Sequence, residues 1–227
     1  MKIAIMQPYF FPYIGYFQLI DSVDIYVNLD HVSFMKSSYM TRNKLKNGIN
    51  INIPIKKASQ NKKCIESFVL PDPRIVNKFK KTIENLYGKE PEFEQIYKYL
   101  FGDESVWKNN LTISQFNLHF IKLVCNYLEI NTKIIESSEG ITTKEKEKGL
   151  QEIVNALKGE TQFPTYVNAI GGIKIYTKKN FEINGIDLKF IKMDNLDFED
   201  EYTSILDLLF RYKKEFIIEQ LKKYTLI

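Results

Sequence analysis

Two kinds of hydrophobic pattern alternate along this chain. Short apolar runs bounded by polar or turn-forming residues predict buried strands. They cover Ile3 to Met6, Ile25 to Leu29, Ile49 to Ile55, Lys133 to Glu136, Thr165 to Ala169 and Leu188 to Met193. Pro54 cannot donate to a ladder, so the third run belongs at a sheet edge or at the end of a strand.

Amphipathic helical patterns fill most of the sequence between these runs. From about Asp72 to Ile130 the apolar residues recur every three or four positions, beginning with Ile75, Phe79 and Ile83. Three helices are expected within this stretch. Other helices are predicted over residues 16–23, 143–157, 173–183, 204–211 and 213–224.

Strands separated by helices of this length favour parallel βαβ units. The sequence therefore predicts an α/β fold with a Rossmann-like, mostly parallel sheet flanked by helices. Residues 72–130 form a helical insert in this scheme, and helices close the chain. We expect one domain over residues 1–227.

The loop after the first strand, MQPYFFPYIGYF, carries a dense set of groups suited to ligand binding. In an open parallel sheet, ligands bind outside the carboxyl ends of strands, and this loop occupies the first such position. Its candidate ligand-binding residues are Gln7, Tyr9, Tyr13, Gly15 and Tyr16. Aromatic and proline-rich loops also occur as plugs over a core, so a binding site and a plug are both compatible with this pattern.

A second polar cluster follows the second predicted strand. It comprises Asn28, Asp30, His31, Arg42, Asn43 and Lys44. Asp30 and His31 are the candidate catalytic base, and Arg42 can grip a phosphate or carboxylate with two hydrogen bonds. A solvated loop with a surface histidine is the alternative.

Polar residues also follow three later strands. Lys57, Ser59, Gln60 and Asn61 come after the third strand, Ser137 after the fourth, and Asn168, Gly171 and Gly172 at or after the fifth. We include them as candidate substrate-binding residues, although the Lys57 segment also fits a solvated turn. The Ser-His-Asp, Walker and GxGxxG signatures do not occur in the sequence.

Composition narrows the possible partners. The net charge of +4 is scattered along the chain, which argues against nucleic-acid binding but is compatible with an anionic substrate. Cys64 and Cys125 have no metal-binding spacing and fit a reducing cytoplasm, and no apolar run is long enough to span a membrane. Aromatic residues make up 14%, which fits either a sugar pocket or a coding bias toward Tyr and Phe.

Four segments together resemble the WbqC-like protein family. They are MQPYFFPYIGYFQLIDSVD, TRNKLKNG, PIKKASQNK and TYVNAIGG, and the resemblance covers nearly the whole chain. It implies a role in the synthesis of bacterial O-antigen and related surface polysaccharides, where a glycine transferase activity is suggested for the family. The residues Ser38 to Thr41 depart from the family pattern before the Arg-Asn pair, which bears on acceptor recognition.

A second likeness concerns a phosphate-binding turn. PYIGYFQLI is similar to the HxGH turn of nucleotidylyltransferases, with Tyr13 and Tyr16 where those enzymes have histidines. A neutral tyrosine supplies no positive charge, so Arg42 or the lysines near Ser59 would have to supply it if ATP binds.

Two functions follow as hypotheses. The first is an acyl or aminoacyl transferase that forms an amide on a nucleotide-linked sugar, with ATP or an acyl thioester as a possible cofactor. The second is a non-catalytic protein that binds a sugar nucleotide or supports an assembly in the same pathway. The apolar terminal helices also allow a homodimer.

Overall fold

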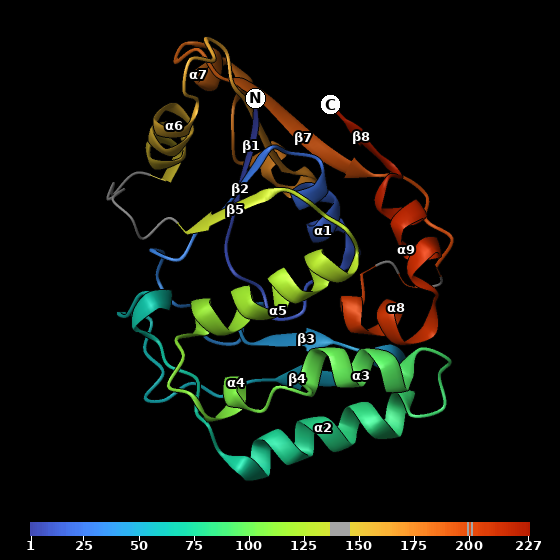
Figure 1. The fold of residues 1–227 in the computed structure, drawn as a ribbon. Helices are drawn as coiled ribbons and strands as arrows, with labels where there is room; N and C mark the ends of the chain where they lie inside the picture. The colour runs from blue at the N-terminus through green and yellow to red at the C-terminus, as the bar shows by residue number, and fades with distance from the viewer. Residues whose placement is uncertain (137–145, 199, 201) are drawn as a thin grey trace.

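The computed structural model describes residues 1–136, 146–198, 200 and 202–227 (Figure 1). Within them, a six-stranded sheet has the order β5-β2-β1-β6-β7-β8. Its strands are β1 (Lys2–Met6), β2 (Ile25–Asn28), β5 (Lys133–Glu136), β6 (Thr165–Ala169), β7 (Asp187–Met193) and β8 (Tyr224–Leu226). All neighbouring pairs are parallel except β7 and β8. The predicted α/β class with a mostly parallel sheet is confirmed.

The strand order places a reversal of direction between β1 and β6. The chain moves outward on one side of β1 to β2 and then β5, and it returns to the other side of β1 for β6 and β7. In open α/β sheets, ligands bind outside the carboxyl ends of the strands at such a reversal. The ends of β1 and β6, at Met6 and Ala169, mark this position.

Both faces of the sheet are covered, and alternate strand residues enter separate cores. Ala4, Tyr26 and Val167 pack with α1 (Ile14–Asp21), α5 (Ile113–Tyr127), α8 (Ile205–Arg211) and α9 (Lys214–Leu221). Ile3 and Val27 pack on the other face against α6 (Lys146–Leu157) and α7 (Lys178–Glu182). Because both faces of the sheet are buried, the sequences of these strands are continuous apolar runs.

A second layer lies beyond the sheet. It contains the hairpin of β3 (Arg42–Lys44) and β4 (Asn50–Asn52), then η2 (Cys64–Glu66), and the first part of the predicted 72–130 insert, which forms α2 (Pro73–Tyr87), α3 (Phe93–Phe101) and α4 (Ser105–Lys108). In Figure 1 this layer lies below the sheet, with α5 between the two. The hairpin turn, η1 (Lys46–Gly48), uses positive φ angles at Asn47 and Gly48, which are the residue types that adopt them most readily.

Side chains define the ends of the two long helices in this region. The Asp72 carboxylate accepts a hydrogen bond from the Arg74 N–H at the start of α2. Thr112 and Gln115 form a reciprocal capping box at the start of α5. Such caps satisfy N–H groups that have no partner within a helix.

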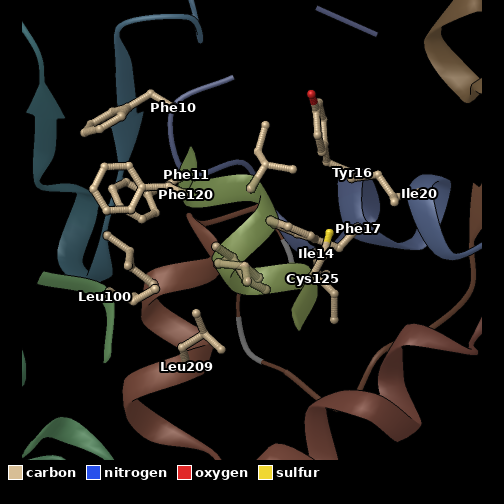
Figure 2. Close-up of a cluster of buried hydrophobic side chains, with 14 of the residues drawn as sticks. Phe10, Phe11, Ile14, Tyr16, Phe17, Ile20, Leu100, Phe120, Cys125 and Leu209 are labelled. Carbon is tan, nitrogen blue, oxygen red and sulfur yellow. The ribbon is translucent and has the colours of Figure 1, made fainter. Parts of the chain in front are cut away.

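An aromatic cluster joins the insert to the loop after β1. Phe10 and Phe11 are buried there, and the Phe11 ring centroid lies 4.6 Å from that of Phe120 (Figure 2). The cluster also contains Phe79, Phe101, Trp107 and Phe116. The tip of the loop is therefore part of the main core.

Three predicted elements were wrong in detail. The strand expected over Ile49 to Ile55 is limited to β4 and pairs only with β3, in a two-stranded sheet separate from the main one. The helix expected over residues 213–224 ends at Leu221, and Tyr224–Leu226 pairs with β7 instead. Helical periodicity cannot reveal a three-residue edge strand, because its partner is distant in sequence. The helix expected over residues 173–183 is divided into η3 (Ile170–Lys174) and α7, with Thr177 in an extended conformation between them.

No helix within the described residues is both long and apolar enough to cross a bilayer.

Replacing Phe11 by Ala should destabilise the protein by about 3–5 kcal/mol, because it removes a fully buried ring from a packed aromatic cluster. Urea unfolding followed by circular dichroism measures this loss. Phe163→Ala is the matched control, since the Phe163 side chain is 70% exposed. We expect that variant to stay within about 0.5 kcal/mol of the wild type, and similar losses in both variants would contradict the assignment of the core.

Candidate active site

The loop after β1 is fixed by side chains from distant segments. The Asn117 Nδ2 donates to the carbonyls of Pro8, at 3.0 Å, and Met40, at 2.8 Å. The Asn43 Nδ2 donates to the carbonyls of Phe10, at 3.0 Å, and Phe11, at 2.6 Å. These bonds satisfy buried carbonyls that no regular element could satisfy.

A third attachment comes from the start of α8. The Ser204 hydroxyl donates to the Phe11 carbonyl at 2.8 Å, and the Ile205 N–H donates to the Pro12 carbonyl at 2.9 Å. Phe11 itself has a φ of +42°, a conformation that a phenylalanine adopts only when its surroundings enforce it. The loop is thus held in one shape.

Some side chains of this loop plug the core, and others lie at the protein surface. Phe10 and Phe11 fill the core, whereas Gln7, Tyr9 and Tyr13 remain partly exposed at the carboxyl edge of the sheet. The two readings of the motif therefore apply to different residues. The buried rings anchor the loop, and the partly exposed side chains are free to contact a ligand.

Two other predicted loop residues serve the interior. The Tyr16 hydroxyl is buried and bonds the Gln7 carbonyl, at 2.8 Å, and the Tyr26 hydroxyl. Burial raises the pKa of Tyr16 far above its ordinary value, so this phenol stays neutral. An added Cβ at Gly15 would lie 2.4 Å from the Tyr13 ring, so the glycine makes room for that ring.

The end of β2 places a carboxylate and an imidazole side by side. The Asp30 side chain is fully buried, whereas 22% of the His31 side chain is exposed. The distance from Asp30 Oδ1 to His31 Nδ1 is 3.7 Å, slightly longer than a hydrogen bond. His31 Nδ1 has no hydrogen-bond partner within the described residues. The pair has the composition of a base and its orienting acid.

Asn28 lies beside this pair at the last position of β2. Its Nδ2 donates to the Ser114 hydroxyl at 2.9 Å, and its Oδ1 has no hydrogen-bond partner among the residues that the structure describes. A buried acceptor without a partner is costly, so it marks a place where a bound donor fits.

Contacts through Cys64 connect this pair with the first loop. The negative charge of Asp30 acts on the buried Cys64 thiol, and the Cys64 Sγ lies 3.5 Å from the Met40 Sδ. The Met40 carbonyl and the Pro8 carbonyl both accept hydrogen bonds from the Asn117 side-chain amide. These contacts link the residues around Asp30 with the residues that anchor the first loop.

The end of β6 completes the site on the other side of β1. The Asn168 Oδ1 accepts from the Ala169 N–H at 2.7 Å, and Gly172 packs closely against the Asn168 amide. Gly171 has open space around it. Gln7 and Asn168 thus lie at the two strand ends that border the reversal in strand order.

The remaining candidates are distributed around this edge. Arg42 and Lys44 lie on the exposed side of β3, whereas the Asn43 side chain points inward and is committed to the loop carbonyls. Residues 62–64 pair with residues 32–34, which brings the neighbouring segment with Lys57, Ser59, Gln60 and Asn61 toward the His31 loop. Ser137 lies outside the described residues.

Two tyrosines that the sequence analysis did not select also lie here. The Tyr39 ring centroid is 5.6 Å from that of Tyr9, and the Tyr202 ring centroid is 5.7 Å from that of Tyr13. Neither belongs to a recognisable motif, and only the folded chain brings them to the first loop.

The described residues contain no group of His, Cys, Asp and Glu side chains that could hold a metal ion. Two shallow grooves, of about 270 and 190 Å³, occur on the insert around α2. They are lined by residues of the hairpin, α2 and α4, and neither includes Asp30, His31 or Gln7. The candidate site is therefore separate from these two grooves.

These features describe an α/β protein with a polar, tyrosine-rich candidate site at the carboxyl edge of its sheet. Residues 7–218 match the model of the WbqC-like protein family, and the chain belongs to that family. It is also similar to an uncharacterized protein of Mycobacterium tuberculosis, Rv1507c, with 23% identity over 224 residues, which is 94% of this chain and 95% of the relative. No solved structure matches the chain.

Replacing Asn117 by Leu should destabilise the protein by about 2–4 kcal/mol, because two buried carbonyls lose their donor. Thermal or urea unfolding tests this expectation. Asn126→Leu is the matched control on the same helix, since Asn126 is exposed. Equal stability of the two variants would contradict the anchoring role of Asn117.

Burial, together with the charge of Asp30, raises the pKa of Cys64 to about 12. The Asp30→Asn variant should lower this pKa but leave it above the ordinary 9.0, because burial is the larger cause. The raised pKa contributes stability below about pH 9 that is lost as the pH rises toward 12. Carbon-13 NMR of labelled cysteine in a Cys125→Ala background measures the titration of Cys64. An unchanged Cys64 pKa in the Asp30→Asn variant would contradict the electrostatic effect of Asp30 on this thiol.

Proposed function

We propose that this protein is an acyl or aminoacyl transferase, with glycyl as the first acyl group to test, that forms an amide on a nucleotide-linked sugar. The observation that carries the proposal is the Asp30–His31 pair at the carboxyl end of β2, beside the partly exposed loop after β1. The family's implied role in surface-polysaccharide synthesis supports the substrate class.

The chemistry requires a base and a site for developing negative charge. The amine nitrogen of an amino sugar attacks the carbonyl carbon of an activated acyl donor, and a C–N bond forms. The nitrogen loses a proton to the base, and the bond from the acyl carbon to the leaving group then breaks. His31 is the better base of the two candidates, because its side chain reaches solvent while that of Asp30 is buried.

Asp30 serves best as the orienting group for His31. A carboxylate near Nδ1 favours the tautomer that carries its proton there, so that Nε2 is left to accept the proton of the amine. The resulting imidazolium is stabilised by the same carboxylate. The distance of 3.7 Å would have to shorten into hydrogen-bond range when substrate binds.

The oxyanion needs donors aimed at the acyl carbon. The Gln7 carboxamide is one candidate donor, since Gln7 follows β1 directly and remains partly exposed. Asn168 lies at the adjacent end of β6 and can orient the sugar. The acyl donor must arrive activated, either as a thioester or as a phosphate anhydride formed from ATP.

Replacement of Asp30 by Asn and of His31 by Gln should each reduce acyl transfer by about 10²–10⁴-fold, the usual contribution of general base catalysis. Purified protein is incubated with glycyl donors of both classes and UDP- or dTDP-linked amino sugars, and amide product is measured by mass spectrometry. His119→Gln is the matched control, because His119 lies on α5 against Phe120 and away from this edge.

Wild-type rates in both Asp30→Asn and His31→Gln would remove the catalytic assignment. Saturable binding of a sugar nucleotide, with no product from any donor class, would favour the alternative function of a non-catalytic sugar-nucleotide-binding protein.

A further inference from the structure

Four tyrosines converge on one surface beside the proposed active site. Tyr9 and Tyr13 come from the first loop, Tyr39 from the segment before β3, and Tyr202 from the segment before α8. The Tyr9 and Tyr39 centroids are 5.6 Å apart at 39°, and the Tyr13 and Tyr202 centroids are 5.7 Å apart at 35°. Tyr13 also lies close enough to Tyr9 and Tyr39 for their charges to affect its pKa, which burial raises first of all. We call these four residues the tyrosine platform.

The outer half of this platform is unusually open. The Tyr39 side chain is 60% exposed and that of Tyr202 is 66% exposed, whereas Tyr9 and Tyr13 are partly buried beneath them. Single exposed rings are common on protein surfaces, but exposed aromatic side chains that gather in one patch mark binding sites. The partly buried rings hold the outer rings in place, so the platform presents aromatic faces at a low cost in side-chain entropy.

Two cationic side chains lie close to the segments that carry the exposed rings. The Arg42 N–H bonds the Ser38 carbonyl, which places β3 directly after the Tyr39 turn. Arg42 and Lys44 are both on the exposed side of β3. Lys44 is 3.9 Å from the Asp200 carboxylate, two residues before Tyr202, and both side chains are about half exposed. Arg42 has no ion pair within the described residues.

Aromatic faces with neighbouring cations match the chemistry of one class of ligand. A nucleoside diphosphate carries a planar base, which stacks on aromatic rings, and a charged diphosphate, which arginine binds with two hydrogen bonds. We propose that the tyrosine platform binds the base of a nucleoside diphosphate, and that Arg42, assisted by Lys44, binds its diphosphate. This inference deepens the proposed function and rests on it for the role of a nucleotide-linked sugar as substrate.

The proposed function gives the bound molecule a direction. With the base on the platform, the sugar has to extend toward Asp30 and His31, because acyl transfer is proposed at that pair.

Direct binding of UDP tests this assignment, with ADP and GDP as further probes. We expect saturable binding by isothermal titration calorimetry to the wild-type protein. Tyr39→Ala and Tyr202→Ala should each weaken UDP binding by about 5- to 100-fold, the range for loss of one base-stacking contact. Tyr39→Phe should retain most of the affinity, because stacking needs the ring and does not need the hydroxyl.

The charge is tested separately from the ring. Arg42→Gln should weaken UDP binding about tenfold in low salt and less at higher salt, and it should leave the binding of uridine unchanged. Tyr99→Ala and Arg74→Gln are the matched controls, since both side chains are exposed and lie on the insert helices α3 and α2. Melting curves establish that each variant is folded.

Several results would overturn the inference. They are the absence of saturable binding of UDP, ADP and GDP by the wild type, unchanged affinity in both tyrosine-to-alanine variants, and equal binding of UDP and inorganic pyrophosphate. If UDP binding depends on Tyr39 but the protein transfers no acyl group, the tyrosine platform is supported and the proposed transferase activity is contradicted. If the protein transfers an acyl group but Tyr39→Ala does not change its nucleotide affinity, the transferase proposal is supported and the tyrosine platform is contradicted.

Discussion

The buried carbonyl groups of the loop from Pro8 to Pro12 are the constraint on which the rest of the structure depends. This segment leaves the sheet and enters the core without forming a helix or a strand, so its carbonyls need partners from elsewhere. Asn117, Asn43 and the start of α8 provide them. A buried carbonyl without a donor costs about 1–3 kcal/mol, so all three distant segments must assemble around the loop.

The aromatic tip of the same loop explains why the insert docks against the sheet. Phe10 and Phe11 belong to the sheet's first crossover, yet their rings pack among the aromatic residues of α2, α3 and α5. Figure 2 shows Phe11 beside Phe120 of α5. Each fully buried ring contributes about 1.5–3 kcal/mol through removal of apolar surface from water. Because the same few residues join both layers, stability of the core and geometry of the site depend on each other.

This arrangement separates the residues that position the site from those that can contact a ligand. Tyr16, Asn43 and Asn117 use their polar groups on the protein's own backbone. Gln7, Tyr9 and His31 keep part of their surface open at the carboxyl edge. The first group is buried and preorganises the second, and a site that needs little rearrangement on binding gains affinity and rate from that preorganisation.

The sequence by itself determined the class of the fold, and it predicted a candidate site at one edge of the sheet. Strand and helix periods depend on local burial, so the parallel sheet, the helical insert and the loop after β1 could be predicted from apolar spacing alone. Asp30 and His31 could be placed at a sheet edge because the carboxyl ends of parallel strands share one edge. Only the tertiary structure decided that Tyr16 and Asn43 are buried in structural roles, that Tyr39 and Tyr202 join the first loop, and that Tyr224–Leu226 extends the sheet. Each of these outcomes depends on contacts between residues far apart in the chain. The spacing of apolar residues along the sequence does not reveal such contacts.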